Sequence, residues 1–139
     1  MQSSRPLSYM AEVGVDYQAE SDNIILHVQG RIDGIYEKED QVVIEEIKTS
    51  TTELENFIEK NSVLHWAQVK IYAAIFAYKR QLSELHIQLT YFQLETQETK
   101  ILNQQFKAEE LNIFLQTTTA MYLEWLDKIE LWPNLAQKG

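Results

Sequence analysis

Residues 30–49, GRIDGIYEKEDQVVIEEIKT, are the most informative stretch of this sequence for both the fold and the candidate functional residues. Residues 23–36 are rich in β-branched side chains, the polar cluster 37–41 follows, and residues 42–49 are again largely β-branched. This pattern predicts two strands joined by a turn. Because side chains alternate faces along a strand, Glu46 and Lys48 project to the same side of the predicted sheet.

The register of this hairpin decides whether Asp33 reaches Glu46 and Lys48. A four-residue loop at 38–41 pairs Asp33 with Glu46. The same loop pairs apolar residues as Tyr36–Val43, Ile35–Ile44 and Ile32–Ile47. Opposed carboxylates destabilise a sheet pair, so something must offset them in this register, and a divalent cation would do so. A two-residue slip would instead pair Arg31 with Glu46 as an ordinary ion pair. It would need a turn without the Asn-Gly or Asp-Gly that two-residue turns prefer, so we favour the four-residue loop.

Asp33, Glu46 and Lys48 together suit phosphodiester hydrolysis. The two carboxylates and the backbone carbonyl of Ile47 are hard oxygen ligands of the kind that Mg²⁺ or Mn²⁺ prefers. Such a metal polarises a phosphate and lowers the pKa of a bound water. Lys48 would orient the attacking water and stabilise the charge that develops near the phosphate.

The specificity of this pattern depends on its context. A Glu-x-Lys match alone is more often surface charge than catalysis. Gly30 and Gly34 on either side of Asp33 favour a site, since glycine within a strand indicates a bulge or a close backbone approach.

The remaining segments predict a mixed α/β protein. A strand at 9–17 comes first. A polar connection at 50–60 leads to a helix capped by Asn61 or Ser62 and running to about Arg80, which is apolar nearly all round and is expected to be buried. Strands follow at 85–92 and 100–106. The last helix is expected to end at Pro133 and to bury one stripe: Leu111, Phe114, Leu115, Thr118, Met121, Tyr122, Trp125, Leu126 and Ile129.

A polar stripe lies on the first predicted helix. His65, Gln68 and Tyr72 are spaced i, i+3 and i+7 and therefore share one face. These side chains either point at a site that needs hydrogen bonds or satisfy neighbouring backbone groups. The pattern alone leaves both interpretations open.

The composition is that of a folded protein. The chain has 139 residues, 45% of them hydrophobic, and suits one domain at 1–139. It contains no cysteine, which excludes disulfides, thiolate metal sites and cysteine nucleophiles within these residues. No apolar run approaches a membrane span and the first residues do not resemble a signal peptide, so we expect a cytoplasmic protein with no membrane partner. The net charge of −9 predicts that this chain alone has a low affinity for nucleic acid.

Three motifs together resemble a known family. Gly30-x-x-Asp33, Glu46-x-Lys48 and Gln68-x-x-x-Tyr72 resemble the RecB-like branch of the PD-(D/E)xK nucleases. More closely, residues 30–34, 46–49 and 65–68 resemble the nuclease-type domain that precedes DinG-like, XPD-related DNA helicases in some bacteria. The similarity extends from about Tyr9 to Trp132.

This resemblance implies a restriction-endonuclease-like core, a mixed central sheet flanked by helices. It also implies Mg²⁺ or Mn²⁺ dependence and DNA cleavage, often exonucleolytic, in DNA repair or processing. Asp33 and Glu46 match the family's metal-binding positions and Lys48 its catalytic lysine, while Gln68 and Tyr72 match its helical motif. A helicase domain, in the same or a partner chain, would supply the DNA grip.

One departure from the family pattern leaves a second function open. Family members usually carry a helix before the first strand, with a further acidic residue of the site. Here the predicted elements begin at the strand, and we do not transfer that role to Glu12 or Asp16. The alternative function is therefore a catalytically silent module of the same fold, for DNA binding or for docking within a helicase.

Overall fold

In the part of the chain that the structure describes, five strands and two helices follow one another in the predicted order. The computed structural model describes residues 9–21 and 24–130. The elements are β1 (Met10–Glu20), β2 (Ile25–Lys38), β3 (Gln41–Ser50), α1 (Leu54–Arg80), β4 (Glu84–Gln93), β5 (Thr99–Lys107) and α2 (Ala108–Glu130). The predicted mixed α/β architecture is therefore confirmed.

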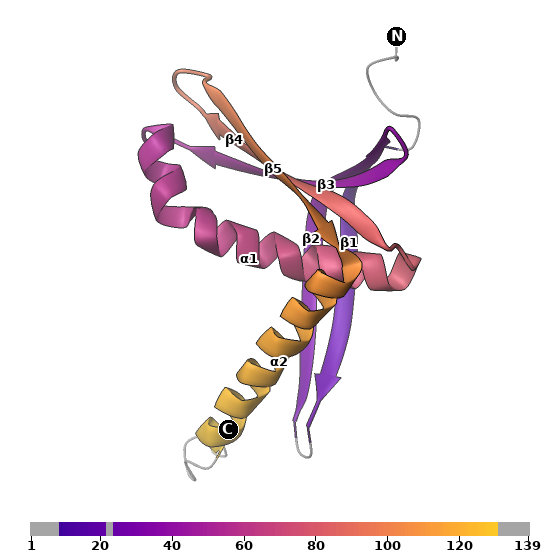
Figure 1. Cartoon of the computed structure of the whole chain (residues 1–139). Helices are drawn as coiled ribbons and strands as arrows, with labels where there is room; N and C mark the ends of the chain where they lie inside the picture. Colours follow the sequence, from indigo (N-terminus) through magenta and orange to yellow (C-terminus); the bar gives the residue numbers. More distant parts are fainter. Residues whose placement is uncertain (1–8, 22–23, 131–139) are drawn as a thin grey trace.

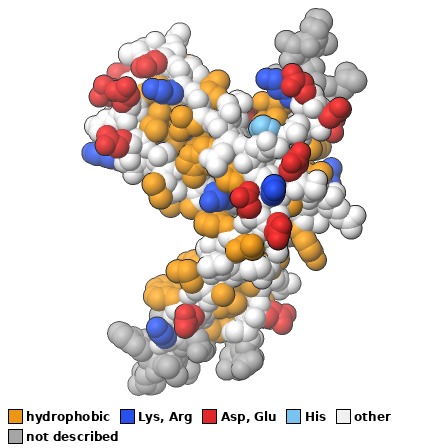
Figure 2. Space-filling view, viewed as in Figure 1, with side chains coloured by type: hydrophobic (Ala, Val, Ile, Leu, Met, Phe, Trp, Pro, Cys, Tyr) orange, Lys and Arg blue, Asp and Glu red, His pale blue; other side chains and the backbone are white. Residues whose placement is uncertain are grey.

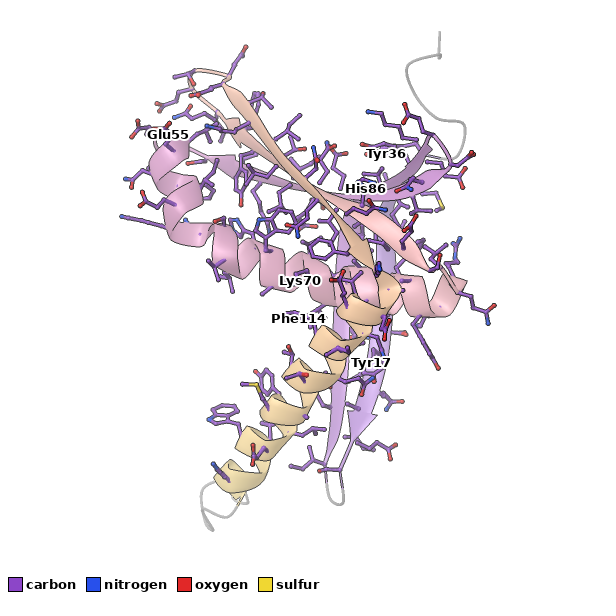
Figure 3. The ribbon with its side chains drawn as sticks, in the orientation of Figure 1. Tyr17, Tyr36, Glu55, Lys70, His86 and Phe114 are labelled. Atoms are coloured by element: carbon purple, nitrogen blue, oxygen red, sulfur yellow. The ribbon has the colours of Figure 1, made fainter. Side chains whose placement is uncertain are left out.

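The strands form one mixed sheet in the order β1-β2-β3-β4-β5. β3 and β4 are parallel and the other neighbours antiparallel. Helix α1 makes the crossover that a parallel pair requires, and Figure 1 shows it running across the sheet. Helix α2 packs on α1, where the Lys70 ammonium lies 4.2 Å from the centre of the Phe114 ring (Figure 3).

The β1–β2 hairpin extends beyond α1 on the same side as α2 (Figure 1). The amide of Gln116 on α2 donates a hydrogen bond to the Tyr17 hydroxyl on β1 at 3.0 Å. Among the described residues, no helix combines the length and hydropathy that a membrane span requires.

The β2–β3 turn keeps the favoured register but is shorter than predicted. Ile35 pairs with Ile44 as expected, and pairing continues one step further, to Lys38 and Gln41. The predicted four-residue loop is therefore wrong, and the turn consists of Glu39 and Asp40, whose φ angles are 53° and 68°. Positive φ at both positions matches the twist of a two-residue hairpin turn. A Glu-Asp pair gives no sequence signal for that conformation.

Helix α1 begins at Leu54, well before the predicted cap at Asn61 or Ser62. Leu54 is only 1% exposed and anchors the first turn in the core, so the segment that we predicted as a polar connection is helical. The expected all-round burial is also wrong. The later turns are buried from Ala73 to Ala77, whereas Val63 is 81% exposed and Leu64 67% exposed.

The predicted apolar stripe of α2 is correct only in its first half. The buried residues follow an i+4 repeat: Leu111, Leu115, Thr119 and Leu123. Met121, Tyr122 and Trp125, which we placed in the stripe, are more than half exposed. Figure 2 shows hydrophobic side chains on the surface of this part of α2. The Ile129 side chain and the predicted stop at Pro133 lie outside the described residues.

Candidate active site

The candidate site lies where β2 separates from β3. The β2–β3 ladder ends at Gly34–Glu45, one step before Asp33. On its other side, Asp33 also drops out of the β1–β2 ladder, opposite Glu12, whose φ is 55°. The predicted Asp33–Glu46 and Ile32–Ile47 ladder pairs therefore do not form.

The side-chain alternation of β2 shifts by one residue at this break. Ile32 and Ile35 are both buried in the core, although they are three residues apart. Gly30, on the same face as Ile32, lies directly under the Tyr72 ring of α1. An irregularity of this bulge type re-aims a side chain and is common beside active sites. Here it turns the carboxylate of Asp33 towards β3.

Asp33 contacts the β3 backbone through a hydrogen bond. Its Oδ2 accepts the N–H of Ile47 at 2.8 Å. Ile47 lies between Glu46 and Lys48, and this bond brings the Asp33 carboxylate close enough for its charge to raise the pKa of Glu46. The N–H and C=O of one strand residue point to the same edge. The Ile47 carbonyl is therefore expected on the side where Asp33 lies.

Glu46 is a buried carboxylate with one unsatisfied oxygen. The residue is 6% exposed, and its Oε2 lies 3.2 Å from the Lys48 Nζ. Its Oε1 is buried and has no hydrogen-bond partner among the described residues. Burial raises the pKa of Glu46, the charge of Asp33 raises it further, and Lys48 opposes both. A buried carboxylate oxygen without a partner is costly, and a bound cation would satisfy it.

Lys48 links this carboxylate to helix α1. Its Nζ donates to the Gln68 Oε1 at 3.3 Å while it pairs with Glu46. One ammonium group is thus held between a strand and a helix. The side chains of Glu46, Lys48 and Gln68 lie together, and Asp33 joins them through the backbone of Ile47.

Tyr72 and His65 lie on α1 with Gln68, but they contact residues other than Lys48. Tyr72 packs on Gly30, where any β-carbon would overlap its ring, so the close approach predicted for this glycine is confirmed. The Nδ1 of His65 lies 2.8 Å from the Tyr91 hydroxyl on β4. Sequence analysis did not single out Tyr91, because it falls in the regular apolar alternation of β4. No sequence signal marks Tyr91, because it becomes the neighbour of Lys48 only in the parallel β3–β4 register of the folded sheet.

The donor set fits a hard divalent cation. The described residues contain no group of three or more His, Asp or Glu side chains placed to hold a metal. The oxygen donors that could hold a metal here are Asp33, Glu46 and the Ile47 carbonyl. All three are oxygen donors, which suits Mg²⁺ or Mn²⁺, and Mg²⁺ in particular usually keeps several waters beside one or two carboxylates. The unsatisfied Glu46 Oε1 is the observation that supports this fit.

The charges on the visible face of the molecule are mixed. On the face shown in Figure 2, Lys and Arg side chains are interspersed with Asp and Glu. A nucleic-acid interface usually concentrates positive charge, because phosphate neutralisation supplies much of the affinity. The surface pattern agrees with the net charge of −9.

The chain belongs to the PD-(D/E)XK nuclease superfamily, whose family model it matches over residues 2–136. The mixed five-stranded sheet with two helices is the restriction-endonuclease-like α/β fold of that superfamily. Membership in this superfamily suggests a phosphodiesterase or nuclease, and the superfamily typically uses divalent metal ions. The RecB-like branch and the helicase association stay predictions. No curated protein matches the chain.

Several solved structures are similar to this chain, among them the following two. One is described as the crystal structure of SSO0001, with 18% sequence identity and a TM-score of 0.49, covering 81% of this chain and 50% of that one. The other is Candida albicans Rai1 in complex with pU5-Mn²⁺, with 15% identity and a TM-score of 0.30, covering 74% of this chain and 26% of that one. The chain thus spans half the length of the first and about a quarter of the second.

Proposed function

We propose that this chain is a metal-dependent deoxyribonuclease domain, with Mg²⁺ or Mn²⁺ held by Asp33, Glu46 and the carbonyl of Ile47. One observation carries this proposal. The buried Oε1 of Glu46 has no partner among the described residues, yet the Asp33 carboxylate lies close enough to raise the Glu46 pKa. Two acidic groups that repel one another and leave an oxygen unsatisfied are a combination that a cation stabilises.

The protein side chains would bind and orient the reacting groups. When bound, the cation supplies Lewis-acid polarisation of the phosphate and activation of water. Lys48 places an ammonium beside Glu46, where it can hold a water or donate to a phosphate oxygen. Gln68 accepts from the same ammonium and limits its motion. Because Lys48 pairs with Oε2, the Oε1 of Glu46 remains available to the metal.

The proposed substrate is DNA, and exonucleolytic cutting in repair or processing is the mode that the resemblance implies. The same proposal includes that this chain belongs to the RecB-like branch and that it works with a helicase domain, in the same or a partner chain. The acidic balance supports a partner, since a net charge of −9 opposes phosphate binding unless another surface supplies positive charge. We place this activity in the cytoplasm.

A catalytically silent module of the same fold is the second candidate function. Two features favour it. The ion pair between Lys48 and Glu46 already compensates one carboxylate oxygen. The described residues also offer two carboxylates to a metal and no third acidic ligand. A silent module would bind DNA or dock within a helicase without cutting.

Cleavage assays separate these two functions. The full chain would be incubated with single-stranded, double-stranded and forked DNA, each with Mg²⁺, with Mn²⁺ and with chelator. We expect metal-dependent cutting that Asp33→Ala, Glu46→Ala and Lys48→Ala each abolish. Glu37→Ala is the matched control, because Glu37 is an exposed carboxylate on the same strand as Asp33. Cutting that survives all three substitutions would indicate a contaminant. Folded protein that binds no Mn²⁺ by calorimetry and cuts nothing would favour the silent module.

A further inference from the structure

A buried tyrosine and a half-buried histidine are paired beside the candidate site. Tyr91 is fully buried on β4, and its hydroxyl oxygen lies 2.8 Å from the Nδ1 of His65 on α1. In the parallel β3–β4 register, Tyr91 is the direct neighbour of Lys48. The pair therefore lies on the face of the sheet that carries the Lys48 ammonium.

The direction of this hydrogen bond follows from the burial of Tyr91. Burial raises the pKa of Tyr91, so the hydroxyl keeps its proton. Among the described residues, His65 Nδ1 is the partner that the structure gives this hydroxyl. If Nδ1 carried a hydrogen and donated it, the hydroxyl proton of Tyr91 would be buried without an acceptor, which is costly. Tyr91 therefore donates and Nδ1 accepts.

The imidazole is also held in orientation by aromatic neighbours. The centre of the His65 ring lies 5.6 Å from that of Tyr91 and 5.8 Å from that of Phe57. Phe57 and Tyr91 meet edge to face at 6.0 Å. These contacts leave the ring little freedom to turn over. With Nδ1 directed at Tyr91, Nε2 is directed away from it.

The tautomer of His65 follows from its protonation state. Burial lowers the pKa of His65, and the positive charge of Lys48 lowers it further, so the imidazole is neutral at neutral pH. A neutral imidazole has one N–H, and Nδ1 is occupied as an acceptor. That hydrogen is therefore on Nε2, which makes Nε2 a hydrogen-bond donor.

We propose that Tyr91 is a positioning residue that fixes His65 in its Nε2–H form, and that this N–H donates to a backbone phosphate of the nucleic acid beside Lys48. This inference rests on the proposed function, because it names how the same site grips its substrate. A neutral donor beside an ammonium adds a directed contact without further charge repulsion at a metal site. It also assigns the polar stripe of α1 two tasks, with Gln68 positioning Lys48 and His65 contacting substrate.

The tautomer is measured first. In protein with ¹⁵N-labelled histidine at neutral pH, we expect His65 to show a pyridine-type Nδ1 and a protonated Nε2. Tyr91→Phe removes the donor and should give a mixture of the two tautomers. Tyr78→Phe is the matched control, because Tyr78 lies on α1 with His65 but is 70% exposed. This substitution should leave the spectrum unchanged. A protonated Nδ1 in the wild-type protein would overturn the assignment.

The phosphate contact is measured with substitutions at His65. Glutamine places its amide nitrogen near the position of Nε2, so His65→Gln should retain affinity for a fluorescein-labelled single-stranded oligodeoxynucleotide. His65→Leu removes the donor and should weaken affinity and raise KM by about tenfold, the size of one hydrogen bond to a charged group, with a smaller effect on kcat. Equal losses in His65→Gln and His65→Leu would contradict the contact.

Failure of this inference is distinguishable from failure of the proposed function. The tautomer and the oligonucleotide affinity are both measured without cleavage. If the wild-type protein cuts no DNA but shows the Nε2–H form and the Gln-against-Leu difference, the nuclease proposal fails and the contact stands. If it cuts DNA but His65→Leu binds and cuts like the wild-type protein, the nuclease stands and the contact is wrong.

Discussion

The carboxylate of Asp33 accepts the backbone N–H of Ile47 at 2.8 Å, just beyond the last ladder pair between β2 and β3. A side chain thus satisfies a β3 backbone donor at the point where β2 no longer pairs with it. This bond places one acidic group at a defined position beside the buried Glu46. It also gives Asp33 a structural task that can be separated from metal binding.

Substitutions at Asp33 should separate these two tasks. Asp33→Asn keeps an oxygen acceptor for the Ile47 N–H and removes the charge that repels Glu46, so its free energy of unfolding in chelator should be no lower than that of the wild-type protein. Asp33→Ala leaves the N–H without this partner and should lose about 1 kcal/mol. Both should lose Mn²⁺ binding and cleavage. Urea unfolding in chelator and calorimetric titration measure the two effects, and an active Asp33→Asn protein would contradict the metal role.

Glu46 should make the metal-free protein less stable as the pH rises. Its pKa is raised above the ordinary 4.5 in the folded state, so between these two pKa values the folded protein binds more protons than the unfolded one. Stability from this group is complete below the unfolded pKa and is lost as the pH rises through the folded pKa. Glu46→Gln removes the ionisation.

We therefore expect Glu46→Gln to be more stable than the wild-type protein at pH 8 in chelator. This difference should shrink towards pH 4. Mn²⁺ should stabilise the wild-type protein and leave Glu46→Gln unchanged, because a ligand stabilises the state that binds it. Denaturant titrations across this pH range measure both effects. A wild-type protein that gains stability relative to Glu46→Gln as the pH rises in chelator would refute the assignment.

Lys48 should be needed for cleavage but not for metal binding. Its ammonium lies 3.2 Å from Glu46 and therefore repels a cation bound there. Lys48→Met should bind Mn²⁺ at pH 8 at least as tightly as the wild-type protein, while kcat falls by about 100-fold or more. Calorimetry and initial rates on one preparation test this, with the exposed Lys60→Met as control. Loss of Mn²⁺ binding together with activity would show that Lys48 organises the metal ligands instead.

Much of the architecture follows from alternation and turn positions in the sequence. The order of elements and the β2–β3 register are read correctly from apolar pairs such as Ile35 and Ile44. The spacing of Glu46 and Lys48 places both on one face, and Gln68 faces them from α1. These features are local or repeat with a fixed period, so a single sequence contains them.

The features that sequence analysis missed depend on tertiary context. The ladder break at Asp33 lies opposite Glu12, which has a positive φ. Glutamate rarely adopts this conformation, so the sequence does not indicate the break. Helix α1 starts early because Leu54 finds a buried position, which its polar neighbours do not indicate. In α2, apolar residues such as Met121 continue on a face that no described element covers. The apolar pattern therefore wrongly predicted that they are buried. Tyr91 looks like any core residue of β4, and its contact with His65 appears only once α1 is placed.

Gly30 should be intolerant of any side chain because of Tyr72. A β-carbon at Gly30 would overlap the Tyr72 ring, and its φ is not positive, so space is the constraint. Gly30→Ala should cost about 1–3 kcal/mol of stability, as overpacking usually does. Gly14→Ala is the control, since the nearest atom to its β-carbon is 4.0 Å away. Adding Tyr72→Ala should recover much of the loss at Gly30, and additive losses in the double variant would mean that the two residues do not meet.

The Glu39–Asp40 turn should be a point where stability can be gained. Both residues have positive φ, a conformation that costs about 1 kcal/mol for residues other than glycine and less for asparagine. Asp40→Gly and Glu39→Asn should therefore each raise the free energy of unfolding by several tenths of a kcal/mol to about 1 kcal/mol. Asp40→Ala should lower it, because alanine tolerates this conformation less well than aspartate. Since the turn is distant in register from Asp33, cleavage rates and Mn²⁺ affinity should not change. A destabilised Asp40→Gly protein would mean that the turn does not adopt this conformation, and the continuation of the register to Lys38 and Gln41 would be wrong with it.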